Sequence, residues 1–320
     1  MNALPRIDYA DHPAYGGMLR PNPALGQAAL EILAPHLEEA RRVEEERTAR
    51  FDGRYRAADP LSAELAQAGA AVRQLEGRAI DRIELAARPL IEQVRERLQA
   101  TRAAGEPIKF RTALAPASPD LLPELWSAIR SAMADMGVLA AAAALYGAPG
   151  AKVRAASVLV NQPGQDWVSR LFRDLDSEPP PTVGMHIDSD GKCFVKSVLY
   201  LDDVGPKQGP FSIVPGSHLW APTGEDRIFR RAFDKSELVV RSRKKRRMFV
   251  SLPEAMQVKA EFGGDMPPGS PEAEALLAQE RVATGPRGQL NLFNPEAVHR
   301  GGNVRAGERR VLLITCGPSW

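Results

Sequence analysis

The feature that most constrains the fold is a change of pattern near Pro149. Before it, apolar residues recur at steps of three and four, the period of a helix with one buried face. The clearest case predicts a helix within 61–102, which Pro89 should divide in two. Its expected buried face consists of Ile80, Ile83, Ala87, Ile91, Val94 and Leu98. After Pro149, short β-type runs such as 158–160 and 197–200 are bounded by Gly, Pro and Asp.

This order of elements favours an α+β chain. Helices followed by many short strands predict a helical layer packed on a sandwich or closed barrel, and argue against a doubly wound parallel sheet. We therefore expect a mainly helical region at 1–150, packed on a β core at 151–320.

Composition excludes several classes of partner. The 42 basic and 40 acidic residues give a formal net charge of +2, which provides no general attraction for nucleic acid or anionic lipid. No stretch reaches the roughly 18 uncharged apolar residues of a membrane span, and the first residues lack a signal-peptide pattern. Cys193 and Cys316 lie in apolar runs and are expected to be reduced thiols. We expect a cytoplasmic protein that binds neither nucleic acid nor membrane, and composition does not constrain its oligomeric state.

His186 and Asp188 are the first candidate metal ligands. In a strand, residues i and i+2 point to one side about 6.6 Å apart, so both could reach one ion. His299 would complete a set of two imidazoles and one carboxylate. Such a set leaves positions open on the far side of the ion, as in non-haem Fe(II) oxygenases, and the absence of thiolates argues against structural zinc. His-x-Asp alone is also typical of an exposed loop pair, so the surrounding sequence must decide.

The surrounding sequence is an ordered series of motifs. His-Ile-Asp at 186–188 is followed by Lys-Gln-Gly-Pro-Phe-Ser-Ile-Val-Pro-Gly-Ser-His at 207–218, Gly-Gln-Leu-Asn-Leu-Phe at 288–293, and His299 with an Arg eleven residues later. From about 155 to 316 this series resembles the phytanoyl-CoA dioxygenase-like family of Fe(II)- and 2-oxoglutarate-dependent oxygenases.

The resemblance implies a double-stranded β-helix core and iron bound by His186, Asp188 and His299, with 2-oxoglutarate and O₂ as co-substrates. It also implies that Arg310 binds the distal carboxylate of 2-oxoglutarate, where a planar guanidinium offers two parallel hydrogen bonds that Lys cannot reproduce. Arg309 is the rival, because strand alternation lets only one of the pair face inward. The spacing from His299 favours Arg310.

Three further positions bear on the reaction. Asn161 matches a position that touches the co-substrate in some relatives. Gly301 departs from the family, which often has Ser or Thr there, so a neighbouring group or water must substitute. Asp188 stands where related halogenases have Gly or Ala, so the resemblance implies hydroxylation or desaturation of a small-molecule C–H bond.

The interval from His218 to His299 is long for the family and suggests an insertion near 222–284. It contains the basic run 241–247, which could capture an anionic substrate or phosphate, although such runs are commonly solvated. His218 itself is expected to support its loop.

Two alternative functions fit the same residues. One is a jelly-roll binding protein whose metal site is vestigial or structural, because fold alone does not establish activity. The other is an iron cupin oxidase that works without 2-oxoglutarate.

Overall fold

The computed structural model describes residues 20–164, 182, 184–188, 193–236, 238, 243–260, 269 and 271–320. Its helices are α1 (Pro23–Thr48), α2 (Pro60–Ala68), α3 (Arg78–Ala103), α4 (Phe110–Ala113), α5 (Pro123–Asp135), α6 (Val138–Tyr146), α8 (Gly224–Ser236), α9 (Arg243–Val250), α10 (Glu254–Ala260) and α11 (Pro271–Gln279), with short 3₁₀ turns η1 (Pro206–Gln208) and η2 (Ser217–Leu219). Its strands are β1 (Ala70–Gln74), β2 (Leu114–Pro116), β3 (Ala151–Asn161), β4 (Val195–Tyr200), β5 (Phe211–Ile213), β6 (Arg281–Ala283), β7 (Gln289–Phe293), β8 (His299–Gly301) and β9 (Arg309–Pro318).

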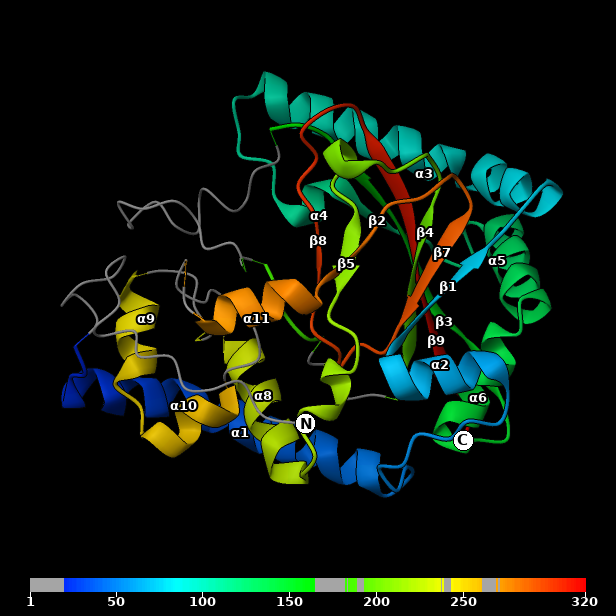
Figure 1. Ribbon diagram of the computed structural model, residues 1–320. Helices are drawn as coiled ribbons and strands as arrows, with labels where there is room; N and C mark the ends of the chain where they lie inside the picture. The colour runs from blue at the N-terminus through cyan, green and yellow to red at the C-terminus, as the bar shows by residue number, and fades with distance from the viewer. Residues whose placement is uncertain are drawn as a thin grey trace.

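The strands form two antiparallel sheets that pack against each other (Figure 1). The large sheet has the order β1-β7-β4-β9-β3-β2, and the small sheet has the order β6-β5-β8. The Phe293 ring from the large sheet lies 4.9 Å from Phe211 and 4.6 Å from His299 in the small sheet, measured between ring centroids. From β4 onward the chain passes repeatedly between the sheets, as in a jelly roll. The predicted α+β fold class is confirmed.

The central strands of the large sheet are buried, which accounts for their apolar sequences. β4 and β9 pair along most of their length and are largely buried. A strand buried on both faces reads as a near-continuous apolar run, which is how 197–200 and 311–314 appear in the sequence.

Two edge strands come from the region predicted to be mainly helical. β1 pairs with β7, and β2 pairs with β3. Gly69 ends α2 in the left-handed conformation (φ 68°), which lets the chain turn directly into β1. The sequence of β1, Ala-Ala-Val-Arg-Gln, has little β propensity, so its pairing depends on tertiary contacts. The division at residue 150 stays a prediction.

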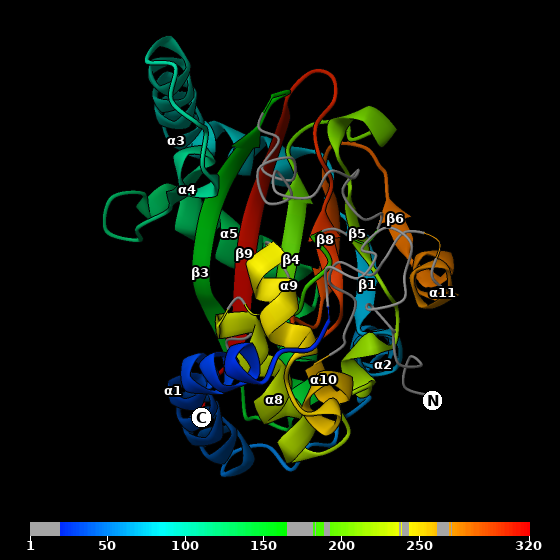
Figure 2. The same ribbon diagram turned by 90° about the vertical axis from the view of Figure 1, so that its left-hand side faces the viewer.

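One layer of helices, containing α3, α5 and α6, covers the outer face of the large sheet (Figures 1 and 2). The buried residues of α3 are the six that its periodicity predicts, but the expected division at Pro89 is wrong, because α3 is a single helix from Arg78 to Ala103. Pro89 lies on the exposed side, where water can bind the backbone carbonyl that loses its partner. Together with the large sheet this layer forms the first hydrophobic core.

A second group of helices lies at another side of the sandwich (Figure 2). α1 packs on α8 and α9, and α8 packs on α10. These helices form a second core that includes Met185, Ile187 and Val298, the neighbours of the candidate ligands. The predicted insertion near 222–284 contains α8 to α11.

The basic run and the longest apolar segments also have defined places. Residues 241–242 of the basic run lie outside the described residues, whereas 243–247 belong to α9, with Lys244 exposed and Arg246 buried. In the described ranges no single helix is long and apolar enough to cross a membrane; α5 and α6 would meet that test only as a pair, bent by 67°.

Candidate metal centre

The structure brings His186, Asp188 and His299 together. One potential ligand atom from each side chain lies within 4.8 Å of the others. His186 Nε2 is 3.9 Å from Asp188 Oδ1, and His299 Nε2 is 3.5 Å from Asp188 Oδ2. These three side chains, the triad, therefore face one common point.

Backbone pairing sets this geometry. His186 and His299 form an antiparallel bridge in which each N–H donates to the other carbonyl, at 3.0 and 2.9 Å. The Asp188 N–H donates to Pro295 O at 2.8 Å. The short segment 186–188 thus pairs with β8 at His299 and with the chain before β8 at Pro295. Alternation turns His186 and Asp188 to one side while Ile187 enters the second core.

Both imidazoles are oriented for metal binding through Nε2. His186 Nδ1 lies 2.7 Å from Gly184 O, and His299 Nδ1 lies 2.8 Å from Ala297 O. A carbonyl oxygen only accepts, so each Nδ1 carries the proton and the Nε2 of a neutral ring keeps its lone pair. Such bonds to the second nitrogen fix the ring orientation in metal sites.

The Asp188 carboxylate has a partner that sequence reasoning missed. Lys196 of β4 donates to Asp188 Oδ2 at 3.0 Å. Burial alone would raise the pKa of Asp188, but His299, Lys196 and His186 together hold it well below its usual value. The carboxylate is therefore ionised and available to a cation at neutral pH. The available signal was a single lysine within the apolar run of β4.

The Pro-Gly-Ser-His turn at 215–218 supports the triad from behind. Ser217 Oγ accepts from Val298 N at 2.7 Å and donates to Val214 O at 2.6 Å. His218 Nε2 lies 3.1 Å from Ala66 O, so this imidazole ties the turn to α2. Burial lowers the pKa of His218.

Arg310 does not face the interior, so that expectation is wrong. Its guanidinium donates to Glu84 of α3, at 3.2 Å, and to Asp202, which follows β4. The hydrogen bond to Asp202 is the main reason that the pKa of Arg310 is raised. Arg309 is the inward residue: it is buried, and its guanidinium contacts Asn161, the residue opposite it on β3.

Arg309 lies inside the sandwich near the triad strand. Its Nη2 donates to Asn161 Oδ1 at 2.7 Å. It also lies close to Gly301, two residues beyond His299: a Cβ added at this glycine would be 3.7 Å from Nη2. Burial lowers the pKa of Arg309 to about 10, so it is cationic at neutral pH. Its buried Nε has no hydrogen-bond partner among the described residues. Asn161, the other predicted co-substrate residue, contacts this guanidinium.

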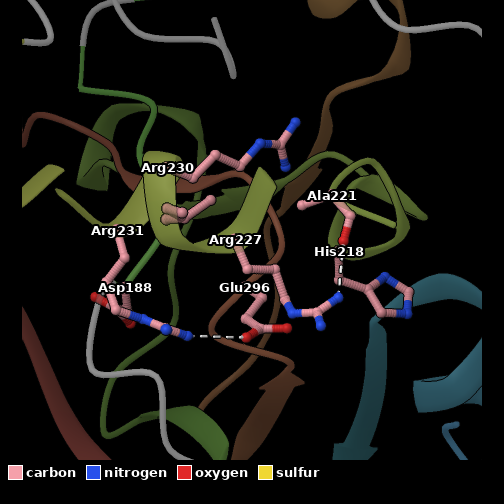
Figure 3. A pocket seen from close by; sticks show the side chains of 8 residues that line it. Asp188, His218, Ala221, Arg227, Arg230, Arg231 and Glu296 are labelled. Carbon is pink, nitrogen blue, oxygen red and sulfur yellow. Dashed lines mark hydrogen bonds and ion pairs between the residues drawn. The ribbon is translucent and has the colours of Figure 1, made fainter. Parts of the chain in front are cut away.

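A buried ion cluster lies next to the triad on the side of α1 and α8. We define it as Glu44, Arg47, Arg227, Arg231 and Glu296. Tyr55 donates a further hydrogen bond to Glu296 at 2.9 Å. Arg227, Arg231 and Glu296 of the cluster line a pocket that also reaches Asp188 (Figure 3). No sequence motif predicts this ion cluster, because its members come from three distant segments.

The donor set fits Fe(II), and the interior of the sandwich fits an oxyanion beside it. Two imidazoles and one carboxylate suit iron and leave ligand positions open. The unsatisfied Nε of Arg309 is a buried donor, a group that proteins normally pair. A carboxylate of 2-oxoglutarate would supply the acceptor.

This combination of fold and donor set defines a class, the non-haem iron oxygenases that use 2-oxoglutarate. The family follows from the sequence: residues 183–311 match the family model described as Phytanoyl-CoA dioxygenase (PhyH). The matched segment contains the triad and Arg309, and over this segment the chain is similar to that family. The resemblance drawn from the motifs is confirmed. No curated protein matches the chain.

Three solved structures with a similar course of the chain illustrate the fold. The α-ketoglutarate-dependent carbocyclase SnoK from nogalamycin biosynthesis is 15% identical, with 82% of this chain and 84% of that chain covered and a TM-score of 0.45. EctD from S. alaskensis, with 2-oxoglutarate and 5-hydroxyectoine, is 13% identical over 82% and 76%, with a TM-score of 0.44. The epimerase SnoN, with Fe³⁺, α-ketoglutarate and nogalamycin RO, is 15% identical over 81% and 82%, with a TM-score of 0.41. At these scores neither substrate nor reaction transfers to this chain.

Proposed function

We propose that the protein hydroxylates, or desaturates, a C–H bond of a small molecule with Fe(II), 2-oxoglutarate and O₂, releasing succinate and CO₂. His186, Asp188 and His299 hold the iron, and Arg309 in place of Arg310 binds the distal carboxylate of 2-oxoglutarate. One observation carries the proposal: the triad and a buried, incompletely paired guanidinium share one interior.

The bound iron supplies the oxidative chemistry that no side chain provides. The chain supplies orientation. The Gly184 and Ala297 carbonyls hold both imidazoles with Nε2 forward, and Lys196 holds one oxygen of Asp188. A carboxylate at this position occupies the place that a halide would need, which favours hydroxylation or desaturation.

The co-substrate end depends on Arg309 and Asn161. The amide oxygen of Asn161 accepts from Nη2 and so fixes the plane of the guanidinium. Nε and the remaining N–H groups can then donate to a carboxylate as a fork. Phe211 and Phe293 pack beside His299 and exclude water from this side of the site.

The test is an anaerobic titration of the Fe(II) protein with 2-oxoglutarate. Chelation of iron by the 2-oxo acid should produce a visible metal-to-ligand charge-transfer band. Arg309→Ala should lower the affinity for 2-oxoglutarate about 10- to 100-fold, which is the contribution of a pair of charge-assisted hydrogen bonds. Arg310→Ala is the matched control, because it removes the neighbouring guanidinium from the outer face.

Two results would overturn parts of the proposal. Loss of the band in Arg310→Ala with retention in Arg309→Ala would reject Arg309 as the anchor. Absence of any band in wild-type protein that holds iron would favour an oxidase independent of 2-oxoglutarate or a binding protein.

A further inference from the structure

The strand that carries His299 is short. β8 consists of His299, Arg300 and Gly301, and it pairs with β5 at these three positions. On its other side, the described residues provide a single bridge, from His299 to His186. Gly301 and Gly302 have no side chains, so Arg300 is the residue whose side chain can fix this strand directly after the metal ligand.

Glu280 joins Arg300 to the neighbouring strand. It lies between α11 and β6, at the end of the predicted insertion, and Figure 1 shows α11 ending beside the small sheet. The Glu280 carboxylate accepts from Arg300 Nε at 2.8 Å and from Arg300 Nη2 at 2.7 Å. It also accepts from the hydroxyl of Ser212 on β5. Ser212 and Arg300 lie opposite each other in the register, so one carboxylate ties the two strands together.

This contact is shielded from water and lies on the far side of the small sheet from the triad. The side chain of Glu280 is 8% exposed and that of Arg300 is 19% exposed. A forked pair between a guanidinium and a carboxylate fixes direction as well as distance. Alternate residues of a strand face opposite sides, so Arg300 points away from the face that carries His299. The carboxylate therefore holds β8 without covering the imidazole.

The residue before His299 is also held by a side chain outside β8. Ser217 Oγ accepts from Val298 N at 2.7 Å, and Val214 N donates to Val298 O at 2.8 Å. Both chain neighbours of His299 are thus anchored from outside the strand. Groups of a functional site must be held within about 0.5 Å of their productive positions, so anchors on the backbone bear directly on ligand geometry.

We propose that Glu280 is a positioning residue for the metal centre. By tying Arg300 to β5, it holds the backbone of His299 so that Nε2 stays directed at Asp188, 3.5 Å away. The predicted insertion would then take part in metal binding through its last residue before β6. The proposal rests on the triad of the proposed function, but it requires neither 2-oxoglutarate nor turnover, so metal binding alone tests it.

The variants are Glu280→Gln and, as matched control, Glu64→Gln. Glu280→Gln keeps the size of the side chain but removes its charge and one acceptor oxygen of the fork. Glu64 makes the same kind of forked pair with Arg73 of β1, at 3.1 and 2.7 Å, on an edge strand of the large sheet. Urea unfolding measures the loss of stability in both variants.

Two measurements report on the metal site of the folded protein. Anaerobic competition against a chelator gives the affinity for Fe(II), and the d–d absorption bands of the Co(II)-saturated protein report the ligand geometry. We expect Glu280→Gln to bind Fe(II) about three- to tenfold more weakly, below the range for groups that hydrogen-bond to metal ligands directly. We also expect its d–d bands to shift. Glu64→Gln should match wild type in both measurements.

A purely structural role for Glu280 predicts a different result. Glu280→Gln would then unfold at a lower urea concentration, but the folded protein would keep the affinity and the bands of wild type. A wild-type value in either measurement overturns the proposal. If wild type itself bound no metal, the triad would be rejected, and the proposed function with it.

Glu280→Asp covers the case in which Glu280→Gln does not fold. It keeps the charge but shortens the side chain by one methylene group, which withdraws the carboxylate from the fork with Arg300. We expect the affinity for Fe(II) to fall about threefold or more. An affinity equal to that of wild type overturns the role of Glu280.

Discussion

The two walls of the site are stabilised in different ways. The large sheet holds Arg309 through the hydrogen bonds that join β9 to β3 and β4, and the apolar faces of helices cover its outer face. The wall made by α1 and α8 instead contains the buried ion cluster beside a smaller apolar core. Breaking a buried ion pair costs far more than losing an exposed one. The wall made by α1 and α8 should therefore be the side that depends on charge balance.

The largest effect should come from removing a carboxylate of the ion cluster. Glu296→Ala leaves Arg47 and Arg231 buried with less compensation, so we expect the free energy of unfolding to fall by about 3–5 kcal/mol. Glu308→Ala is the control on the other wall, because its carboxylate pairs with Arg95 but is partly exposed. That loss should be about 1 kcal/mol or less. Urea unfolding of both variants measures the difference, and equal losses would contradict the contrast between the walls.

The triad joins both walls, and removing its carboxylate should weaken metal binding. Asp188→Ala should lower the affinity for Fe(II) about a hundredfold or more, because even the groups that hydrogen-bond to metal ligands contribute up to about that factor. Anaerobic competition against a chelator measures the affinity. Asp120→Ala removes an exposed carboxylate and should change nothing. Iron affinity of wild-type strength in Asp188→Ala would show that Asp188 is not a ligand.

Lys196 tests whether the large sheet orients the ligand held by the small one. Lys196→Met keeps the length of the side chain but no longer donates to Asp188, so Fe(II) affinity should fall about tenfold. Lys152→Met, an exposed lysine on β3, is the control. Tighter iron binding in Lys196→Met would mean that the ammonium group competes with the ion and does not position its ligand.

The smallest effect is a pH dependence confined to the ion cluster. Burial alone would raise the pKa of Glu296, but Arg47, Arg231, the hydrogen bond from Tyr55 and Arg227 lower it below its ordinary value of 4.5. Its stabilising contribution is therefore present above about pH 4.5 and is lost as pH falls below that value.

Urea unfolding between about pH 5 and pH 3 measures this loss. Glu296→Gln should show a flatter dependence on pH than wild type. A slope equal to that of wild type would show that other carboxylates, on either wall, cause the acid sensitivity.

The sequence alone predicted those features of the fold and of the metal site that depend only on the spacing of neighbouring residues. The buried face of α3 and the apolar runs of β4 and β9 follow from local spacing, and His186-Ile187-Asp188 follows from alternation in an extended segment. These features require no knowledge of distant partners.

Features set by tertiary pairing were not predictable in this way. Alternation alone says that one of Arg309 and Arg310 faces inward, but the choice is made by the register of β9 against β3, which places Arg309 opposite Asn161. The continuity of α3 across Pro89 depends on that residue being exposed. The ion cluster joins segments whose charges look like ordinary surface residues in the sequence, and nothing local to β4 indicates that Lys196 pairs with Asp188.

The backbone bridge between His186 and His299 has a consequence for how the metal site assembles. Bringing together two groups roughly a hundred residues apart in a flexible chain costs about 4 kcal/mol of entropy. The reciprocal hydrogen bonds join backbone atoms of these residues and leave both Nε2 atoms out of the contact. Because the backbone closes this loop, we expect the metal-free protein to fold unaided and to release or exchange its ion without unfolding.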